Sequence, residues 1–185
     1  MPKNMIWHDQ RLIGNPPGSM AQNIFSVNNT FELQNAIGWI RTYAQSQGRL
    51  DNLFIMCHGF ESIVGDDATQ VSEQRGGFGL QICRQNINNT NLSAVAPLSG
   101  FIARIVIFAC ATADTANSLR NSPGDGRLFC REFTSYTNAT IIASDTPQIY
   151  HGASATGIIN FGAWEGNVYQ FTPDGNVRRI DGSSV

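Results

Sequence analysis

The sequence predicts an α/β fold with a mostly parallel sheet, helices on both faces and an antiparallel ribbon along one edge near the C-terminus. Through most of the chain, short apolar runs typical of strands alternate with segments of helical periodicity. This order favours parallel strands joined by crossover helices. Near the C-terminus, strand-like runs are separated by turn residues alone, which is typical of antiparallel pairing.

The length and composition of the chain indicate a single globular domain. Its 185 residues are 42% hydrophobic, which is enough to bury a sizeable core. We place this domain at residues 23–185 and expect residues 1–22 to form a peripheral N-terminal segment.

The first predicted strand covers residues 23–27, and a helix follows it. Asn29 or Thr30 can cap this helix, which runs to about Gln47 and stops at Gly48. Its apolar residues recur at helical spacing and predict one buried face, formed by Leu33, Ile37, Ile40 and Ala44.

Two longer strands occupy the middle of the chain, one ending at Cys57 and one over residues 103–109. Between them lie a polar, glycine-containing stretch (60–77), a short strand (78–82) and a short helix near 93–98. These elements continue the alternation of strand and helix expected for a parallel sheet.

The second half of the chain repeats this alternation and then changes pattern. A loop (112–126) precedes a helix over about 127–137 and a strand at 140–143. The tail has apolar runs at 158–164 and 168–171. The turn-forming residues of the tail are Glu165-Gly166-Asn167 and Pro173-Asp174-Gly175-Asn176. We therefore predict an antiparallel ribbon that closes the edge of the sheet.

Charge and hydropathy argue against nucleic-acid and membrane binding. The chain has 12 basic and 14 acidic residues and no basic run, so it lacks a phosphate-neutralising patch. No stretch approaches the roughly 18 apolar residues of a membrane span, and the first residues lack the apolar core of a signal peptide. We expect a cytoplasmic protein, while its delivery as an effector and its oligomeric state stay open.

The cysteine spacing argues against a metal site and a disulfide framework. Cys57, Cys83, Cys110 and Cys130 form no CxxC pair and no metal-ligand spacing with the three histidines. We therefore expect no metal, no cofactor and a reducing compartment. Cys57, Cys83 and Cys130 read as small buried hydrophobes. The pair Asp66-Asp67 lacks calcium-ligand spacing and reads as a solvated loop.

Two dipeptides at predicted strand ends carry the functional hypothesis. His58-Gly59 ends the apolar run 53–57, and Ala109-Cys110 ends the run 105–108. Reactive groups gather outside the carboxyl ends of parallel strands, so these residues could face one crevice. A thiol beside an imidazole is the arrangement of a cysteine nucleophile with its acid/base partner.

Less specific interpretations of these residues remain open. A cysteine at a strand end is often structural, and a histidine before glycine often begins a turn. His8 and His151 are competing bases, His8 in the N-terminal segment and His151 after the strand that follows Cys110. We favour His58 over both.

These segments resemble a known family. Residues 55–59 (I-M-C-H-G) and 107–111 (I-F-A-C-A) are similar to the His-Gly and Ala-Cys signatures of the caspase-like (clan CD) cysteine peptidases. That group includes caspases, metacaspases, legumain, gingipains, separase and bacterial CHAT peptidases. His58 precedes Cys110 by 52 residues (110 minus 58), close to the roughly 50 residues of caspases.

The resemblance extends to three further segments and covers roughly residues 23–164. They are G-F-G-L-Q-I at 77–82, G-D-G-R-L-F-C-R-E-F at 124–133 and T-I-I-A-S-D at 140–145. These segments look most like those of bacterial members of the group.

The resemblance implies a caspase-like three-layer sandwich and a cysteine endopeptidase that needs no cofactor. Cys110 would attack the scissile carbonyl as a thiolate, and His58 would donate a proton to the leaving amine. The N–H groups of Gly59 and Cys110 would form the oxyanion hole. The partner would be a protein or peptide substrate.

The specificity of the named subfamilies does not carry over. Caspases have Q-A-C-[RQG]-G at the nucleophile, whereas this chain has F-A-C-A-T at 108–112. Metacaspases have an acidic residue just before the cysteine region, and none occurs between Ala103 and Thr112.

Two acidic residues are the candidate substrate-binding residues. Asp145 and Asp114 follow strand ends on the predicted active face, so either could pair with an Arg or Lys at P1. We prefer Asp145 because it directly follows the strand end at Ser144. The alternative is that both cap turns, in which case P1 would be small or apolar.

Two other classes of function remain as alternatives. One is a catalytically inactive caspase-like recognition module, which the presence of both His58 and Cys110 disfavours. The other is a thiol acyltransferase or amidase that uses the same dyad on a small molecule.

Overall fold

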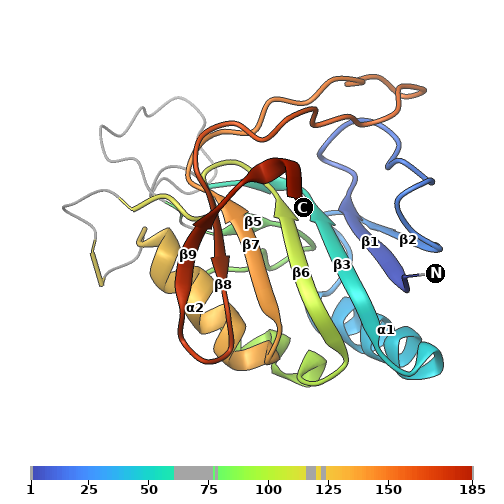
Figure 1. The fold of residues 1–185 in the computed structure, drawn as a ribbon. Helices are drawn as coiled ribbons and strands as arrows, with labels where there is room; N and C mark the ends of the chain where they lie inside the picture. Colours follow the sequence, from blue (N-terminus) through green and yellow to red (C-terminus); the bar gives the residue numbers. More distant parts are fainter. Residues whose placement is uncertain (1, 61–76, 78, 116–119, 122–123, 185) are drawn as a thin grey trace.

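The computed structural model describes residues 2–60, 77, 79–115, 120–121 and 124–184. A seven-stranded sheet with the order β2-β1-β3-β6-β7-β8-β9 forms its centre (Figure 1). The strands are β1 (Asn4–Asp9), β2 (Asn23–Val27), β3 (Leu50–Met56), β6 (Ile102–Phe108), β7 (Thr140–Ser144), β8 (Val168–Phe171) and β9 (Val177–Ile180). The first five are parallel, and β8 and β9 are antiparallel. This confirms the α/β class and the mostly parallel sheet.

Two helices of the predicted pattern are present. The first, α1 (Leu33–Gln47), ends at Gly48, whose φ of 87° suits glycine. It begins later than predicted, because Asn28 and Thr30 form a turn and Gln85 accepts the hydrogen bond of the Leu33 N–H at 2.9 Å. The second helix, α2 (Gly126–Thr137), is capped by the Asp125 carboxylate.

The helices α1, α2 and the 3₁₀ helix η1 (Leu92–Leu98) all pack on one face of the sheet, so for the described residues the prediction of α-helices on both faces is wrong. The steps from β2 to β3, β3 to β6 and β6 to β7 run in one direction along the sheet. Right-handed crossovers then lie on one face. The step from β1 to β2 runs the other way, so residues 10–22 lie on the opposite face.

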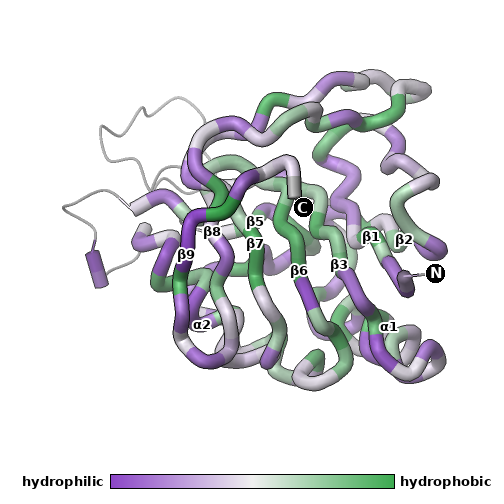
Figure 2. The backbone as a smooth tube through the Cα atoms, viewed as in Figure 1, coloured by the Kyte–Doolittle hydropathy of each residue, from purple (hydrophilic) through white to green (hydrophobic). Residues whose placement is uncertain are grey.

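The opposite face is covered by extended chain and by the 3₁₀ turn η3 (Gly182–Ser184) in the described part of the structure. Phe108 on β6 stacks on Phe161 at 4.9 Å and on Trp164 at 4.8 Å between ring centroids. Apolar residues concentrate along the central strands, and polar residues lie on the outer segments (Figure 2).

The prediction that the N-terminal residues form a peripheral segment is wrong. Residues 4–9 form β1, an inner strand between β2 and β3, and Met5, Ile6 and Trp7 are completely buried. An inner parallel strand is buried on both faces and shows no polar alternation, and this run is short. The pattern therefore did not distinguish it from a loop.

The C-terminal antiparallel ribbon is formed by other strands than predicted. Residues 158–164 form isolated bridges, Ile158 with Asn15 and Asn160 with His151, instead of a strand. The hairpin is formed by β8 and β9 around the predicted turn, where the Gly175 N–H donates to the Thr172 carbonyl at 2.9 Å. A separate two-stranded sheet pairs β4 (His58–Gly59) with β5 (Leu80–Gln81).

No helix in the described ranges is long and apolar enough to cross a membrane.

Candidate active site

The two predicted strand ends lie next to each other in the sheet. β3 and β6 are hydrogen-bonded neighbours, and Met56 at the end of β3 is in register with Phe108 at the end of β6. Both strands point to the same edge of the sheet (Figure 1). Cys57-His58 and Ala109-Cys110 therefore leave the sheet side by side, where ligand sites of α/β sheets form.

Gly59 packs directly against the backbone of Cys110. A Cβ atom at position 59 would collide with the Cys110 carbonyl oxygen and lie 3.0 Å from its nitrogen. β4 also pairs His58 with Gln81 and Gly59 with Leu80, which fixes this segment. The structure thus brings His58, Gly59 and Cys110 together, and only glycine permits this approach.

The half-buried His58 ring is oriented by a backbone carbonyl. Its Nε2 lies 3.1 Å from the Arg11 carbonyl oxygen. Because a carbonyl oxygen only accepts hydrogen bonds, Nε2 must carry the hydrogen, and the neutral ring keeps its lone pair on Nδ1. Nδ1 is therefore the nitrogen that can exchange a proton with a reacting group.

Cys110 lies on a strained and well-anchored turn. Ala111 has a φ of 48°, a left-handed conformation that is uncommon for alanine and that clusters at functional sites. The Ala111 N–H donates to the Thr146 carbonyl at 2.9 Å, and the Ala113 N–H donates to the Ser144 carbonyl at 2.8 Å. The Cys110 thiol donates to the Gln148 carbonyl at 3.9 Å. The end of β7 thus holds the turn in place.

The other three cysteines are buried, as predicted, whereas Cys110 is half-buried. Burial raises the pKa of the Cys57 and Cys130 thiols and raises that of Cys83 to about 12. A buried thiol resists ionisation because the thiolate loses its hydration. These three residues are therefore poor nucleophiles at neutral pH.

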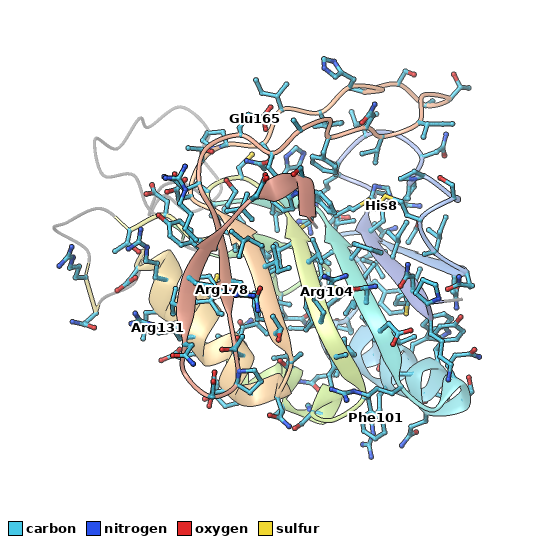
Figure 3. All side chains as sticks on the ribbon, viewed as in Figure 1. His8, Phe101, Arg104, Arg131, Glu165 and Arg178 are labelled. Atoms are coloured by element: carbon cyan, nitrogen blue, oxygen red, sulfur yellow. The ribbon has the colours of Figure 1, made fainter. Side chains whose placement is uncertain are left out.

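The two competing histidines lie elsewhere. His8 is buried on β1 (Figure 3), with Nε2 2.8 Å from the Leu12 carbonyl and Nδ1 3.4 Å from the Ser26 hydroxyl. Its burial lowers its pKa. The expectation that His8 is peripheral is therefore wrong. His151 has an exposed side chain, and its backbone pairs with Asn160.

Both candidate acidic residues have structural partners. The Asp145 carboxylate accepts hydrogen bonds from the N–H and the side-chain amide of Asn167, each at 2.9 Å. This is the turn-capping arrangement considered as the alternative for Asp145. The Asp114 carbonyl accepts the N–H of Gly126 at 2.7 Å, which ties the nucleophile loop to the start of α2. Arg104 (labelled in Figure 3) is the third residue of β6, whereas Cys110 follows the other end of that strand.

Asp9 and Arg11 are site residues that the sequence interpretation missed. The Asp9 carboxylate is fully buried and lies 2.8 Å from the Arg11 guanidinium, and the Arg11 carbonyl contacts His58. Hydrogen bonding to Asp9 raises the pKa of Arg11. A usable signal existed, because Asp9 comes two positions after the apolar run Met5-Ile6-Trp7, as Cys110 comes two positions after the run 105–108.

A groove of about 1180 Å³ lies on the sheet face opposite the helices. Phe108, Phe161 and Trp164 line it, and among the described residues neither His58 nor Cys110 does. The two candidate catalytic residues thus lie outside this groove, although Phe108 precedes Cys110 by only two positions.

No cluster of His, Cys, Asp and Glu in the described ranges could hold a metal ion. Asp66-Asp67 lies outside those ranges, as do Phe78 and most of the polar stretch 60–77. Comparison of the chain with protein-family models, curated proteins and solved structures finds no match.

Proposed function

We propose that this protein is a caspase-like cysteine endopeptidase that hydrolyses peptide bonds through Cys110 and His58. The observation that carries the proposal is the packing of Gly59 on the Cys110 backbone at the adjoining ends of β3 and β6. This packing puts an imidazole and a thiol at the same edge of the sheet.

The reaction begins when Nδ1 of His58 takes the proton of the Cys110 thiol. The thiolate attacks the scissile carbonyl carbon, and the N–H groups of Gly59 and Cys110 donate to the resulting oxyanion. His58 then gives its proton to the leaving amine, which leaves a thioester on Cys110. Water, deprotonated by His58, hydrolyses the thioester and releases the acid product.

Three features support these roles. The Arg11 carbonyl occupies Nε2 and leaves Nδ1 for proton transfer. Cys110 is more exposed than the other three cysteines. The turn after Cys110 is strained at Ala111, as expected where the backbone holds a reactive group in place.

The substrate is a protein or peptide, and we propose cleavage after Arg or Lys. The Asp145 carboxylate has acceptor capacity beyond its two bonds to Asn167, and Asp114 is the second candidate. The four cysteines are free, and we place the enzyme in the cytoplasm because free thiols suit a reducing compartment.

The test is covalent labelling by a peptidyl electrophile, with peptide mapping by mass spectrometry. We expect labelling of Cys110, and loss of both labelling and peptide hydrolysis in Cys110→Ala and His58→Ala. His151→Ala, which alters an exposed competing base, should keep both. Hydrolysis by Cys110→Ala would overturn the proposal.

The same experiment separates the alternative functions. Labelling of Cys110 without cleavage of any member of a peptide library would favour a thiol acyltransferase or amidase. Absence of labelling in a folded protein would favour a recognition module without catalytic activity.

A further inference from the structure

A buried ion pair lies at the carboxyl edge of the sheet, beside the proposed dyad. Asp9 ends β1, and Arg11 follows it by two residues. Arg11 donates to the Asp9 carboxylate through Nε at 2.8 Å, Nη2 at 2.8 Å and its backbone N–H at 3.0 Å. The Asp9 side chain is completely buried, and the Arg11 side chain is 25% exposed.

The pair is tied to a second segment at Cys83. The Cys83 N–H donates to Asp9 Oδ2 at 2.9 Å, and Nη2 of Arg11 donates to the Cys83 carbonyl at 2.8 Å. Cys83 follows β5, which pairs with the strand that contains His58. Asp9, Arg11 and Cys83 thus close a ring of hydrogen bonds between β1 and the β4–β5 sheet.

This ring fixes the backbone of Arg11 as well as its side chain. The Leu12 N–H donates to the Asp9 carbonyl at 3.0 Å and closes a turn around residue 11. The Arg11 carbonyl is left to accept the Nε2–H of His58 at 3.1 Å. The position of this carbonyl therefore depends on a turn and on a bidentate ion pair.

We propose that Asp9 and Arg11 are positioning residues for His58, because their ion pair holds the Arg11 carbonyl where it selects the Nε2–H tautomer. The Nδ1 lone pair then stays available for the proton of Cys110. Neither residue touches the reacting atoms. This inference rests on the proposed function for its catalytic consequence, and its effect on His58 is measurable without any activity.

A purely stabilising role accounts less well for this arrangement. A buried ion pair is a weak source of stability because desolvation of both charges offsets their attraction. In some proteins a buried ion pair is retained because it fixes one particular geometry, and the geometry here is that of the carbonyl bonded to His58.

The first measurement uses the unaltered protein. Nitrogen-15 NMR of the neutral histidine rings should show the Nε2–H tautomer for His58, assigned by comparison with His58→Gln. A predominant Nδ1–H tautomer would overturn the inference, whatever the variants do.

The second measurement compares Arg11→Met and Asp9→Asn with a matched control. The control is Arg84→Met, which removes an exposed ion pair to Glu32 of the same chemical type. We expect both variants to mix the His58 tautomers and to lower kcat on a peptide substrate about 10- to 100-fold, as for other residues that orient a histidine. KM should change little, and the control should match the unaltered protein in both respects.

A lysine variant tests the geometry of the pair. Arg11→Lys keeps the charge but cannot make the two-pronged contact with Asp9 and Cys83, so it should not restore the single tautomer. Full recovery by lysine would contradict the positioning role.

The outcomes separate the two proposals. Suppose that the unaltered protein cleaves no peptide but shows the Nε2–H tautomer of His58, and that Arg11→Met and Asp9→Asn lose this single tautomer. The proposed function then fails and the positioning inference holds. If the unaltered protein cleaves peptides and folded Arg11→Met and Asp9→Asn keep both kcat and tautomer, the positioning inference fails. Circular dichroism identifies folded variants, and the spectrum of the unaltered protein decides if neither folds.

Discussion

At the scale of single residues, the site depends on two small residues and on one backbone carbonyl that orients His58. Gly59 lets two backbones touch, Ala111 takes a left-handed conformation, and a carbonyl at Arg11 selects one nitrogen of His58. Each feature constrains where the imidazole or the thiol can lie. Together these three local features set the geometry of the proposed dyad.

Replacing Gly59 by alanine should disrupt the site. The added methyl group overlaps the Cys110 carbonyl, so we expect hydrolysis to fall by about 100-fold or more and stability to fall by about 1–3 kcal/mol. Gly38→Ala is the matched control, because an added Cβ in α1 meets nothing within 4 Å. It should stabilise the protein by about 0.5–1 kcal/mol. Peptidase assays and urea unfolding measure both effects, and unchanged activity in Gly59→Ala would contradict the close approach.

Asp145→Ala tests the proposed specificity. If the Asp145 carboxylate binds P1, the ratio of kcat/KM for Arg substrates to that for Leu substrates should fall about 10-fold or more in the variant. Asn167→Ala is the control, because it removes the side-chain amide bond to Asp145 but keeps the carboxylate and the backbone N–H that also donates to it. Comparison of kcat/KM on matched Arg, Asp and Leu peptides decides, and an equal loss in both variants would assign Asp145 a structural role.

At the scale of elements, the ends of helices and strands organise the loops around the nucleophile. Asp125 caps α2 by accepting the Leu128 N–H at 3.0 Å, and it also accepts the Thr115 hydroxyl at 2.7 Å. Burial raises the pKa of Asp125, but the hydrogen bonds from Asn121, Thr115 and Leu128 outweigh it and lower the pKa. The cap therefore joins α2 to the loop that follows Cys110.

Asp125→Ala should destabilise the protein by about 1–2 kcal/mol at pH 7 through loss of this cap. Because the folded-state pKa is lowered, the stabilising effect is present above the ordinary pKa of 3.8 and is lost as pH falls through the folded-state value. The difference in unfolding free energy between variant and parent should thus shrink below about pH 4. Urea unfolding at several pH values measures it, and a constant difference down to acid pH would contradict the ionised cap.

At the scale of the whole molecule, strand order decides both the layers and the site. β1 separates β2 from β3, and the chain reverses its direction of travel along the sheet after β2. The helices consequently collect on one face. The first step, from β1 to β2, runs in the opposite direction and takes residues 10–22 over the other face, which brings the Arg11 carbonyl to His58.

A chain that begins at Asn23 should not fold cooperatively. It would lose the inner strand β1, including the fully buried Met5, Ile6 and Trp7. At about 1.5–3 kcal/mol for each buried apolar side chain, this loss is comparable with the total stability of a typical domain, about 5–15 kcal/mol. A chain that begins at Lys3 keeps β1 and serves as the control. Circular dichroism and thermal unfolding distinguish the two, and a cooperative transition in the shorter chain would show that β1 is dispensable.

The sequence by itself determined the α/β class, the parallel strands that lead to Cys57 and Cys110, and the helices α1 and α2. Periodicity, caps and turn residues act over a few positions and can be read locally. The hypothesis that His58 and Cys110 meet also came from local pattern, because the carboxyl ends of parallel strands share one edge.

The tertiary structure alone decided the contacts between distant segments. These are the inner position of β1, the gathering of helices on one face, the packing of Gly59 on Cys110 and the ring of Asp9, Arg11 and Cys83. Each depends on which strand pairs with which, and pairings between residues far apart in the chain leave no periodicity in the sequence. The Arg11 carbonyl is the clearest case, because every residue has a backbone carbonyl and only the fold selects the one that contacts His58.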